Sequence, residues 1–531
     1  MSTVSYIIFL LISIQAFLTE AGNVVIFPMM SRSQLLNAAR IATILADDGH
    51  NVTIAIPTND EPDIKKSPAY NLIFYKTSMS RENEQRVYKE AAKFTPLNLL
   101  LGRAPTTMTE VMTQRCRGVL FDEEFIEMLS DLKPDMAIVH LAVPCVIAHL
   151  VRMGVPFMDF CSVPLMHAMC GYPHRVPAPP SYVPDGPYQS IPHSFSERLL
   201  NSLIYTFMPL VFNYGIIGPV QKELYRYQEQ HQLPYENTVQ LRSKASFLLV
   251  HGDLSFETVR PSLPKVVYIG GIQCDAPKPL EGELKDFIDG VSDDYLGTIV
   301  FSLGGVLNTE GLPRHFIDTF MEVFRQMPTY QVVWKLKSIP DGLVVPNNVK
   351  IVDWMPQQDL LGHTKTKLFI THGGIQGSFE SICHGVATLG IGIFGDQVGN
   401  IQVLKRKGMA LSIDDYKTIT QEEVKGKLNQ LLTDGTFQQN AINARSLFHD
   451  QPSTVDERLK FAVEYTIRHK GAHHLTSQAA LSMHWFQYYS FDVYLFLIIT
   501  AWIILVIGYF LVKTCLRCCV SICRLSKAKV E

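Results

Sequence analysis

Between Trp354 and Gln397 the chain gathers an indole, an imidazole, amides and carboxylates around a glycine pair, in the letters WMPQQDLLGHTKTKLFITHGGIQGSFESICHGVATLGIGIFGDQ. Trp354 offers a flat apolar face on which a base can stack. The letters THGG end an expected strand and open a helix, where free backbone N–H groups and the positive helix end favour a phosphate. Glu380, one to two turns along that helix, can accept hydrogen bonds from sugar hydroxyls. Together these residue types can contact a flat ring, an anion and hydroxyl groups of one ligand.

Such side chains need rigid elements to hold them, and the chain supplies two blocks of alternating strands and helices. In the first block, NVVIFP (23–28), a helical stretch (33–50) and VTIAIP (52–57) form a βαβ unit. The second block begins with the strand TIVFSL (298–303). Repetition of the unit predicts an α/β fold with two Rossmann-like domains that face one cleft. Further strands are expected at DMAIVHL (135–141), VPFMDF (155–160), QVVWKL (331–336), NVKIVDW (348–354) and KLFITHGG (367–374).

Three other stretches have patterns of their own. The Pro-rich segment 172–192 is expected to be a loop that covers the cleft, and 195–232 is expected to be helical and amphipathic. The charged stretch 452–469 predicts one more helix, just before the C-terminal apolar segment.

The spacing of the polar residues in the chemical stretch resembles that of the UDP-glycosyltransferase family. The resemblance also covers YIGG (268–271), FSLGG (301–305), VEYTIRHKGAHHL and the C-terminal apolar segment, and so nearly the whole chain. It implies a GT-B-type fold, in which an N-terminal domain (22–285) binds the acceptor and a C-terminal domain (286–450) binds the UDP-sugar. The residues that match the family in order are Trp354, Gln357, His372, Glu380, Asp396 and Gln397.

The resemblance assigns a role to each matching position. Trp354 stacks on uracil, and the backbone of Gln357 supports the edge of the base. Glu380 binds both ribose hydroxyls, and Asp396 with Gln397 holds the hydroxyls of the donor sugar. The expected phosphate contacts are His372, Gly373, Gly374, Ser302, Gly304 and Gln376, with Arg260 as a further source of charge. Gln376 is a departure, because the family commonly has Asn there. UDP-sugar is the donor substrate, and neither a metal nor another cofactor is implied.

The catalytic positions fit the family badly. The family uses an N-domain His as general base and an Asp that orients it, and counting from Gly49-His50 and from Cys145 places Gln34 and His140 there. An amide cannot accept a proton near neutral pH, so Gln34 is not a base. Three interpretations remain open. His140 acts as base while Gln34 positions the hydroxyl, or the acceptor is already acidic, or the chain binds UDP-sugar with little or no transfer.

Both ends of the chain carry apolar segments, and we interpret them differently. Residues 1–21 have the layout of a cleaved secretory signal, and 493–512 is long enough for one transmembrane helix. Lys and Arg follow that span, in a tail at 513–531, and are missing from 472–492 before it. The positive-inside rule therefore predicts a single-pass type I protein with a lumenal body. The final letters KAKVE resemble a dilysine retrieval signal, which predicts residence in the endoplasmic reticulum. Residues 451–492 are expected to be a helix and a juxtamembrane segment.

Cysteine, charge and one sequon complete the expectations. Six of the ten cysteines lie in the body and four lie in the tail. The body cysteines can form disulfides, but the sequence does not tell which cysteine pairs with which. The sequon at Asn51 is a candidate for N-glycosylation. The net charge of −3, without basic blocks, argues against nucleic acid as a partner. The absence of GxGxxG after the first strand argues against a nicotinamide enzyme.

The expected activity is an inverting transfer from a UDP-sugar to a small lipophilic acceptor, in a protein held by the membrane. The candidates for an apolar acceptor pocket are Met29, Met30, Met108, Met112, Met166 and Met169. The alternative is a weak or inactive member that binds UDP-sugar and assembles with active relatives as a regulatory partner. The degraded catalytic pair favours the alternative, and the complete donor signature opposes it.

Overall fold

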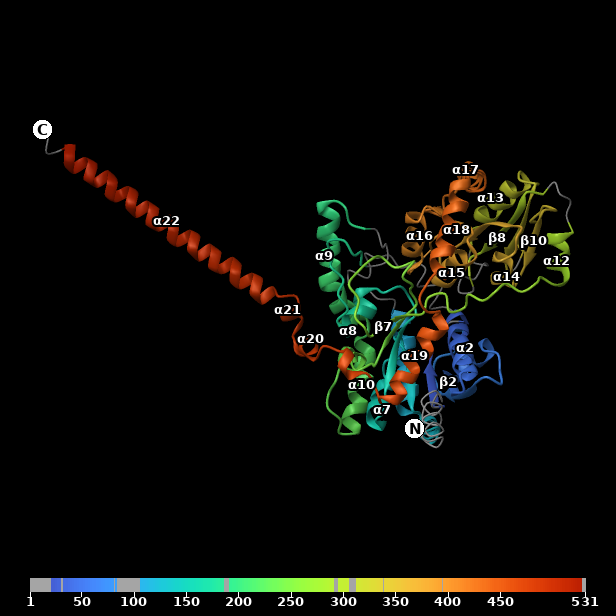
Figure 1. Cartoon of the computed structure of the whole chain (residues 1–531), viewed down its shortest axis with the longest axis horizontal. Coiled ribbons are helices and arrows are strands. Elements are labelled where there is room, and N and C mark those ends of the chain that lie inside the picture. The colour runs from blue at the N-terminus through green and yellow to red at the C-terminus, as the bar shows by residue number, and fades with distance from the viewer. Residues whose placement is uncertain are drawn as a thin grey trace, which may run out of the picture. The chain divides into compact units, whose positions relative to one another are not determined.

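The computed structural model describes residues 21–29, 32–80, 82–83, 106–185, 191–290, 295–304, 312–337, 339–393 and 395–527. The chain divides into two compact units, Met1–Thr476 and Ser477–Glu531. Two separate parallel sheets, each with its own helices, make up the first unit (Figure 1). The expected α/β fold with two Rossmann-like halves is therefore confirmed.

In the described part of the chain, the first sheet has seven strands in the order β3-β2-β1-β4-β5-β6-β7, all parallel. Their side chains are buried on both faces in most positions, which is why these segments are runs of Val, Ile and Phe without polar alternation. The strands are β1 (Asn23–Phe27), β2 (Asn51–Pro57), β3 (Asn71–Tyr75), β4 (Met136–His140), β5 (Phe157–Cys161), β6 (Leu248–Val250) and β7 (Val266–Tyr268).

Helices cover both faces of this sheet, and each face has its own hydrophobic core. One core contains α5 (Thr106–Phe121), α7 (Val146–Met153) and α10 (Gly218–Gln230). The other contains α2 (Arg32–Asp47) and α19 (Val455–Arg468), which lie side by side in Figure 1. Shorter or more peripheral elements are η1 (Thr58–Asp63), α6 (Glu123–Asp131), η2 (His167–Gly171), α8 (Tyr172–His174), α9 (Phe195–Leu210), η3 (Val211–Ile216) and α11 (Thr238–Ser243).

The helix α19 returns to the first sheet after the chain has completed the second. Leu459, Ala462 and Val463 are fully buried in the core that also contains α2. Their spacing of three and four residues places them on one face of the helix. The expected helix at 452–469 is thus present, and it packs on the N-terminal half. The boundaries proposed at 285/286 and 450/451 remain predictions.

The second sheet has six parallel strands in the described residues, in the order β10-β9-β8-β11-β12-β13. The strands are β8 (Gly297–Ser302), β9 (Tyr330–Lys335), β10 (Val349–Val352), β11 (Thr366–Thr371), β12 (Ala387–Gly390) and β13 (Ala410–Ser412). The helices are α12 (Gly282–Asp289), α13 (Arg314–Arg325), α14 (Gln357–Leu361), α15 (Ile375–His384), α16 (Gln397–Arg406), α17 (Gln421–Thr433) and α18 (Gly435–His449). The chain reverses its direction of travel across the sheet between β8 and β11, and ligands of open α/β sheets bind at such a point.

Three disulfides link the six body cysteines: Cys116–Cys145, Cys161–Cys170 and Cys274–Cys383. The third joins the segment after β7 to α15 and so ties the two halves of the first unit. His449 lies beside it, with its Nε2 at 3.1 Å from the carbonyl oxygen of Cys383. Cys274, Cys383 and His449 lie close enough together to resemble a metal site. Both sulfurs are in the disulfide, however, so the thiolates that would bind a metal ion are missing.

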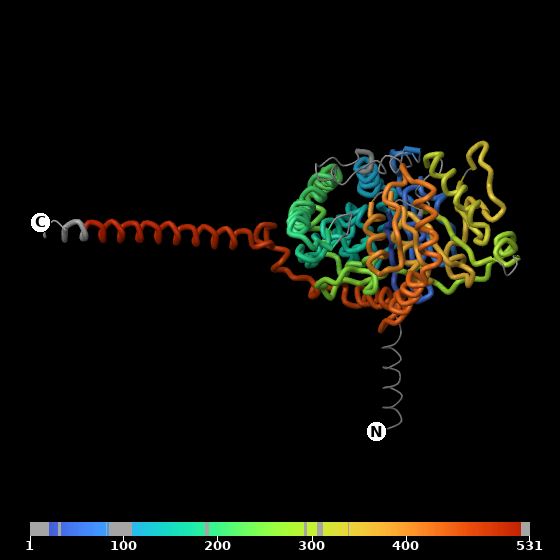
Figure 2. Tube along the Cα trace, turned by 90° about the horizontal axis from the view of Figure 1, so that it is seen from above, coloured from blue at the N-terminus to red at the C-terminus, as the bar shows by residue number. Residues whose placement is uncertain are grey.

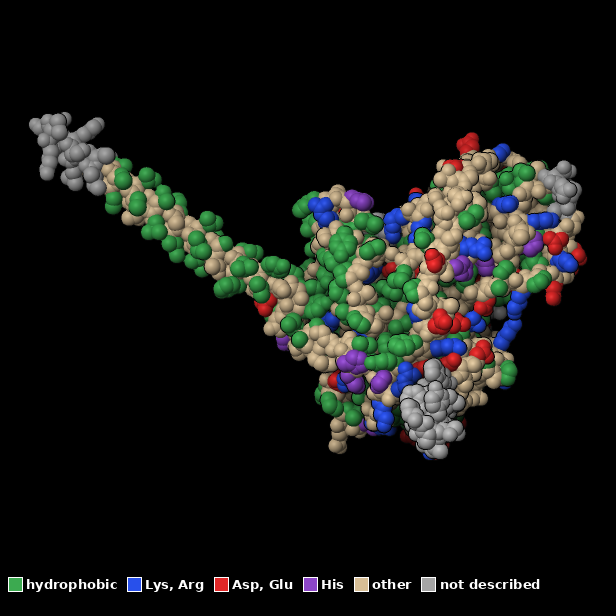
Figure 3. All heavy atoms as spheres, viewed as in Figure 1, with side chains coloured by type: hydrophobic (Ala, Val, Ile, Leu, Met, Phe, Trp, Pro, Cys, Tyr) green, Lys and Arg blue, Asp and Glu red, His purple; other side chains and the backbone are tan. Residues whose placement is uncertain are grey.

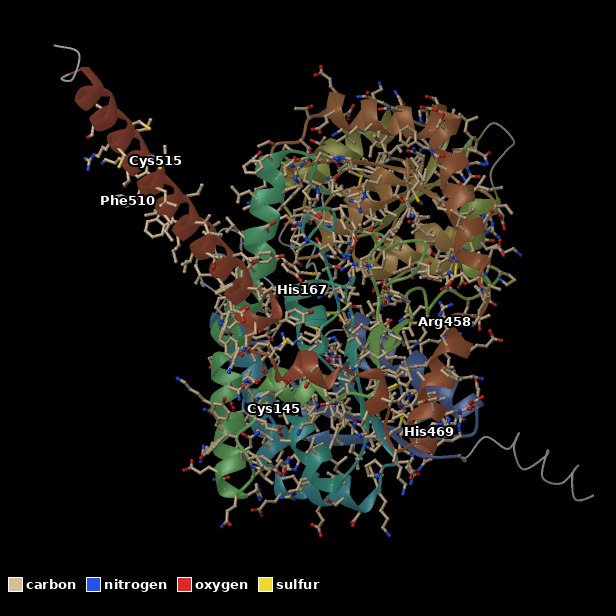
Figure 4. The ribbon with its side chains drawn as sticks, turned by 60° about the vertical axis from the view of Figure 1, so that its left-hand side comes forward. Cys145, His167, Arg458, His469, Phe510 and Cys515 are labelled. Atoms are coloured by element: carbon tan, nitrogen blue, oxygen red, sulfur yellow. A yellow bond between two sulfur atoms is a disulfide. The ribbon has the colours of Figure 1, made fainter. Side chains whose placement is uncertain are left out.

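The second unit contains α20 (Gln478–Ser482), α21 (Trp485–Tyr488) and the long helix α22 (Phe491–Lys527). Its stretch Phe491–Ser521 is long and apolar enough to cross a bilayer, and none of the most apolar window is buried in protein. Figure 2 shows α22 as one continuous helix, and Figure 4 shows side chains that project outward from it, Phe510 and Cys515 among them. This helix fits a single membrane anchor. Residues 1–20 of the expected signal and residues 528–531 of the KAKVE ending lie outside the described residues.

Candidate functional site

The expected donor residues other than Arg260 lie near the carboxyl ends of the second sheet, where its strand order reverses. Ser302 ends β8, and the adjacent strand β11 ends at Thr371, its register partner. His372 follows directly, and α15 begins three residues later. The first turn of α15 therefore has free backbone N–H groups beside the end of β8, which suits a phosphate.

Glycines make room for the imidazole of His372. A Cβ at Gly304 would lie 2.6 Å from its Cε1, and a Cβ at Gly374 would lie 2.7 Å from its Nε2. Gly304 also has φ +81°, which other residues rarely adopt. Gly373 has φ +79°, and a Cβ there would collide with Ile401. Gly304 and Gly374 thus pack closely on His372, and we call the turn 372–374 the phosphate turn. Gly305, the second glycine of FSLGG, lies outside the described residues.

Burial keeps the imidazole of His372 neutral. Burial and, next, the positive charge of Lys335 lower the pKa of His372 to about 4. A neutral imidazole still has one N–H to donate, so His372 can bind a phosphate oxygen without bringing a charge of its own. The positive charge near His372 comes from Lys335, a residue that the sequence analysis did not name.

Lys335 is placed by the end of β9, next to β8. Its Nζ lies 4.3 Å from the centre of the Trp354 ring, and about half of the Trp354 side chain is exposed. A cation above an indole is attracted by the ring, and this orders both side chains. The Lys335 ammonium therefore covers one face of the Trp354 ring. The sequence contained a usable signal, because Lys335 directly follows the buried run QVVW at the carboxyl end of an expected strand.

Glu380 lies on α15 and receives a hydrogen bond from the side-chain amide of Gln357, the first residue of α14. Burial raises the pKa of Glu380 to about 7, although Gln357 and Lys335 both oppose the rise. The prediction for Gln357 was a contact to the base through its backbone. In the structure its side chain orients the carboxylate that is expected to bind the ribose.

Asp396 and Gln397 lie at the start of α16, and their side chains have different hydrogen-bond partners. The Gln397 side chain is buried, and its Oε1 accepts a hydrogen bond from the Ile393 N–H at 2.9 Å. Asp396 is bonded by the Asn400 amide at 2.7 Å, and the same amide donates to the Gly373 carbonyl at 3.0 Å. Asn400 therefore ties the expected sugar site to the phosphate turn. Burial raises the pKa of Asp396.

The amide of Gln376 points to the other half of the unit. Its Nε2 donates to the Ser33 carbonyl and to Asn37 Oδ1, both at 2.8 Å, and both acceptors belong to α2. Gln273 also donates to Asn37 Oδ1, at 2.7 Å, and the Asn37 amide donates to Gln34 Oε1 at 3.2 Å. Asn37 is fully buried. We call these four side chains, Gln34, Asn37, Gln273 and Gln376, the amide cluster.

A buried histidine adjoins the amide cluster. His251 follows β6, and its Nδ1 lies 3.4 Å from the Asn37 amide nitrogen. Burial alone lowers the pKa of His251 to about 4. Together with Gln273, Gln376 and Glu380 it lines a small cavity between the two halves. The sequence analysis named neither Asn37 nor His251, because their role depends on contacts between segments more than 200 residues apart.

His140 occupies a different environment from Gln34. It ends β4 and is almost fully buried, with Nδ1 accepting the Ala142 N–H at 3.1 Å and Nε2 lying 2.6 Å from Ser162 Oγ. Since Nδ1 accepts, the neutral ring carries its proton on Nε2 and donates it to Ser162. Burial lowers the pKa of His140 to about 3. As placed, His140 has no ring nitrogen left for a substrate proton.

Arg260 is engaged within the N-terminal half. Its guanidinium donates to the Leu165 carbonyl at 2.5 Å and pairs with Glu257 at 3.3 Å, and both charged side chains are nearly buried. Burial raises the pKa of Glu257, with Arg260 opposing the rise. The donor-site role of Arg260 thus requires that this ion pair open.

The sequon residue Asn51 is exposed at the amino end of β2. Its amide donates to Asn23 Oδ1 at 2.9 Å, and its Oδ1 accepts from Asn71 at 3.2 Å. The three asparagines form a row across β1, β2 and β3. An N-glycan at Asn51 remains a prediction, and its attachment would break the bond that Asn51 donates.

Comparison with solved structures shows which class this fold belongs to. The calicheamicin glycosyltransferase CalG4 is similar with a TM-score of 0.57 at 13% identity, over 85% of this chain and 99% of that one. A second solved structure, LpCGTa in complex with UDP, has a TM-score of 0.53 at 15% identity, over 84% and 99% of the two chains. The fold is therefore the GT-B fold of glycosyltransferases.

Sequence comparison shows the family. The family model described as UDP-glucoronosyl and UDP-glucosyl transferase matches residues 22–529. UDP-glucuronosyltransferase 2A3 of Cavia porcellus is 32% identical over 494 residues, 90% of each chain. UDP-glucuronosyltransferase 2A2 of Homo sapiens is 31% identical over 531 residues, 96% of this chain and 94% of that one. The chain belongs to the UDP-glycosyltransferase family.

Proposed function

We propose that the protein transfers a hexosyl or glucuronosyl group from a UDP-sugar to a small lipophilic acceptor, with inversion at the anomeric carbon. The observation that carries the proposal is the convergence of Trp354, His372 and Glu380 at the carboxyl ends of the second sheet. An indole, a helix start with an imidazole and a buried carboxylate match the three parts of uridine diphosphate in order. Of the two donor classes, UDP-glucuronate is favoured by the names of the relatives at about 31% identity.

The proposed donor contacts begin with the base and the diphosphate. Uracil stacks on the face of Trp354 that Lys335 does not cover, and Lys335 lies near enough to attract the diphosphate. The first turn of α15, His372 and the turn at Ser302 and Gly304 receive the phosphates. Donation from His372 to the leaving UDP stabilises the charge that develops as the glycosidic bond breaks.

The ribose and the donor sugar are bound at the flanks of this turn. Glu380, held by Gln357, accepts from the ribose hydroxyls once its carboxyl is ionised. Asp396 faces the phosphate turn through Asn400 and binds the sugar hydroxyls, whereas Gln397 supports the loop from inside. Gln376 and Arg260 contribute to donor binding only after their present contacts have opened.

Deprotonation of the acceptor is the step with the weakest support. Gln34 cannot accept a proton, and His140 is buried, bonded at both nitrogens and far less basic than an ordinary histidine. A base with a pKa well below the working pH gives little assistance. We therefore favour an acceptor that is already acidic, such as a phenol or a carboxylic acid, over the proposal that His140 is the base.

The proposed location is the membrane of the endoplasmic reticulum, with the body in the lumen and the tail in the cytosol. Three disulfides in the body suit an oxidising lumen, and the basic residues after the span suit a cytosolic tail. The KAKVE ending adds the retrieval signal.

The second candidate function is a partner that binds UDP-sugar and assembles with active family members without transferring sugar. Its specific support is Gln34, an amide at the position where the resemblance implies the base, which the amide cluster ties to Asn37 and, through it, to Gln376. The donor site does not distinguish the two candidates, because both require UDP-sugar to bind.

One assay separates them. The full chain, in membranes, is given UDP-glucose or UDP-glucuronate with phenol, carboxylic acid and alcohol acceptors, and UDP release is measured. The proposal predicts release that depends on the acceptor, is strongest with acidic acceptors and is abolished in Glu380→Ala. UDP binding without release for any acceptor, in both wild type and Gln34→His, would establish the partner function instead.

A further inference from the structure

The described cysteines fall into two groups that differ in chemical state. In the body, six cysteines form three disulfides. On α22, Cys515, Cys518 and Cys519 have free and exposed thiols. Disulfides persist in an oxidising compartment, whereas a reducing compartment keeps thiols free. The division therefore agrees with the proposed topology, in which the body is lumenal and the residues after the span are cytosolic.

The three thiols lie just beyond the part of α22 that fits the hydrocarbon core. The stretch 493–512 has no charged residue and is long enough for that core, and Lys513 ends it. The helix continues without a break to Lys527. At a rise of about 1.5 Å per residue, Cys515 lies about 5 Å and Cys519 about 10 Å past residue 512. The thiols are thus expected at the depth of the lipid headgroups.

The same thiols share one face of the helix. Cys515 and Cys519 are four residues apart, and Cys518 is three residues from Cys515, the two spacings that place side chains on one side. Figure 4 shows the Cys515 side chain projecting from α22. Lys513 and Arg517 are also four residues apart, but each is two residues from Cys515, about 200° around the helix. A thiol face is therefore opposed to a basic face.

The apolar length of α22 exceeds what the hydrocarbon core can cover. The stretch Phe491–Ser521 has 31 residues, which is about 45 Å of helix against a core of about 30 Å. Figure 3 shows hydrophobic side chains along α22. In the excess that follows Lys513, the side chains of Leu516 and Val520 are 61% and 52% exposed. This part of the helix is apolar, yet it lies beside headgroups.

A free thiol at this depth meets the substrates of fatty acylation. A long-chain acyl-coenzyme A keeps its chain in the lipid. The cysteine Sγ attacks the carbonyl carbon of that thioester, and a new thioester forms. The bond between this carbon and the sulfur of coenzyme A breaks, and coenzyme A leaves as a thiol that takes up the proton of the cysteine. One thioester replaces another, so neither an oxidant nor a reductant is needed.

We propose that Cys515, Cys518 and Cys519 form a site of S-acylation by fatty acyl-coenzyme A at the cytosolic end of α22. Juxtamembrane cysteines are where such acylation occurs. The proposal rests on the topology proposed above and is independent of glycosyl transfer, because an inactive partner would carry the same site.

The geometry disfavours two other uses of clustered thiols. A structural zinc ion is surrounded by four ligands in a tetrahedron. Three thiols along one side of a straight helix cannot surround an ion, and α22 contains no histidine. A disulfide to a second copy of the chain would need an oxidising compartment on this side of the membrane.

Acylation would bring the thiol face into contact with hydrocarbon that the cysteine side chains alone do not reach. The acyl chains would turn this face to the lipid, and Lys513 and Arg517 would face the headgroup phosphates and water. Because α22 is itself a membrane anchor, the acyl groups orient the tail and are not needed for attachment. Variants without these thiols should therefore stay in the membrane fraction.

The first test follows a clickable palmitate into the full chain, expressed in cultured animal cells. We expect label that hydroxylamine removes, because hydroxylamine cleaves thioesters. Cys515→Ser/Cys518→Ser/Cys519→Ser should lose the label and remain in the membrane pellet after carbonate extraction. Cys523→Ser, which removes the other cysteine of the tail, is the matched control and should keep the label. No label in wild type, or label that the triple variant keeps, overturns the proposal.

The second test counts the acyl groups. In denatured full chain, free thiols are blocked with N-ethylmaleimide, thioesters are cleaved with hydroxylamine, and the new thiols are tagged with polyethylene glycol maleimide. No reductant is added, so the disulfides of the body stay closed. We expect a gel shift of up to three tags, one for each cysteine, which requires hydroxylamine and is lost in the triple variant. The same shift in the triple variant would contradict the proposal.

A third measurement checks the topology separately. The tag is added outside sealed microsomes, before and after hydroxylamine, with detergent as the last step. We expect the tail thiols to react from outside, and only after hydroxylamine. Full reaction from outside without hydroxylamine would leave the topology intact and contradict acylation. Reaction only after detergent would contradict the topology, and the proposal with it.

Discussion

Gln376 on α15 donates a hydrogen bond of 2.8 Å to Asn37 on α2, and so joins the two Rossmann-like halves through side chains 339 residues apart. Where the family commonly has Asn, the longer Gln reaches across the boundary between the halves. The residue expected to contact a phosphate is thereby part of the amide cluster that contains Gln34. Gln376 and Gln34, the two amides at which the sequence analysis expects a departure from the family, are therefore linked through Asn37.

Loss of Asn37 should destabilise the protein. Asn37→Ala leaves Gln376, Gln273 and Gln34 without a common buried partner, so we expect a loss of about 1–3 kcal/mol in the free energy of unfolding. Denaturant unfolding of the full chain in detergent measures it. The control, Asn443→Ala on the exposed face of α18, should change stability by less than about 0.5 kcal/mol. Equal effects in the two variants would mean that the amide cluster does not couple the halves.

Donor binding should weaken in acid. Burial raises the pKa of Glu380 to about 7, and ribose hydroxyls favour its ionised form, so binding of the donor lowers that pKa. Affinity is therefore full above pH 7 and falls as the pH drops below it, with a limiting slope of about tenfold per pH unit. Calorimetry with UDP-glucose from pH 5.5 to 8 measures the profile, because that diphosphate has no group of its own titrating there. Glu380→Gln should bind more weakly and without this dependence; an unchanged profile would assign it to another group.

His140 should prove structural. His140→Ala leaves the Ala142 N–H and the Ser162 hydroxyl without their partner, which we expect to cost about 1–3 kcal/mol of unfolding free energy. The pH profile of kcat with a phenol acceptor should keep its shape. A loss of kcat of about 10² or more together with a lost acidic limb is the result that would make His140 the general base.

Gln34→His should raise turnover. An imidazole at this position restores a group that accepts a proton near neutral pH, and general-base assistance is worth about 10²–10⁴-fold. We expect kcat with an alcohol acceptor to rise toward that range and to acquire a limb with the pKa of a histidine. Gln34→Asn, which keeps an amide, is the matched control. No gain in Gln34→His, in a variant that still binds UDP, would place the defect elsewhere.

Much of the fold was predictable because the buried parallel strands are runs of β-branched and aromatic residues. The stretches expected at 23–28, 52–57 and 298–303 are β1, β2 and β8 within one or two residues. The sequence analysis did not name β3, β6, β7 or β13. The strands β6, β7 and β13 have only three residues each, too few to show a periodic pattern, and β3 is half-exposed. The packing of α19 on the first sheet also escaped prediction, because periodicity identifies a buried face and not its partner.

At the site, the sequence predicted the residues whose spacing along the chain matches the family. It missed the residues that reach the site only through tertiary contacts. His372, Glu380 and the glycines lie together because one strand, one turn and one helix hold them. Lys335 comes from a strand outside that stretch, and Asn37 comes from the other half of the body. The contacts of Gln376, Arg260 and His140 with the N-terminal half were likewise invisible, since each depends on a partner distant in the chain or on burial.

The central claim is that uridine diphosphate binds with its base on Trp354, and calorimetry of the full chain with UDP tests it most directly. Base stacking on an aromatic side chain is worth about 1–3 kcal/mol, so Trp354→Ala should weaken UDP binding by about 10- to 100-fold while Trp354→Phe retains most of the affinity. An absence of UDP binding in wild type, or equal affinity in wild type and Trp354→Ala, would contradict the account.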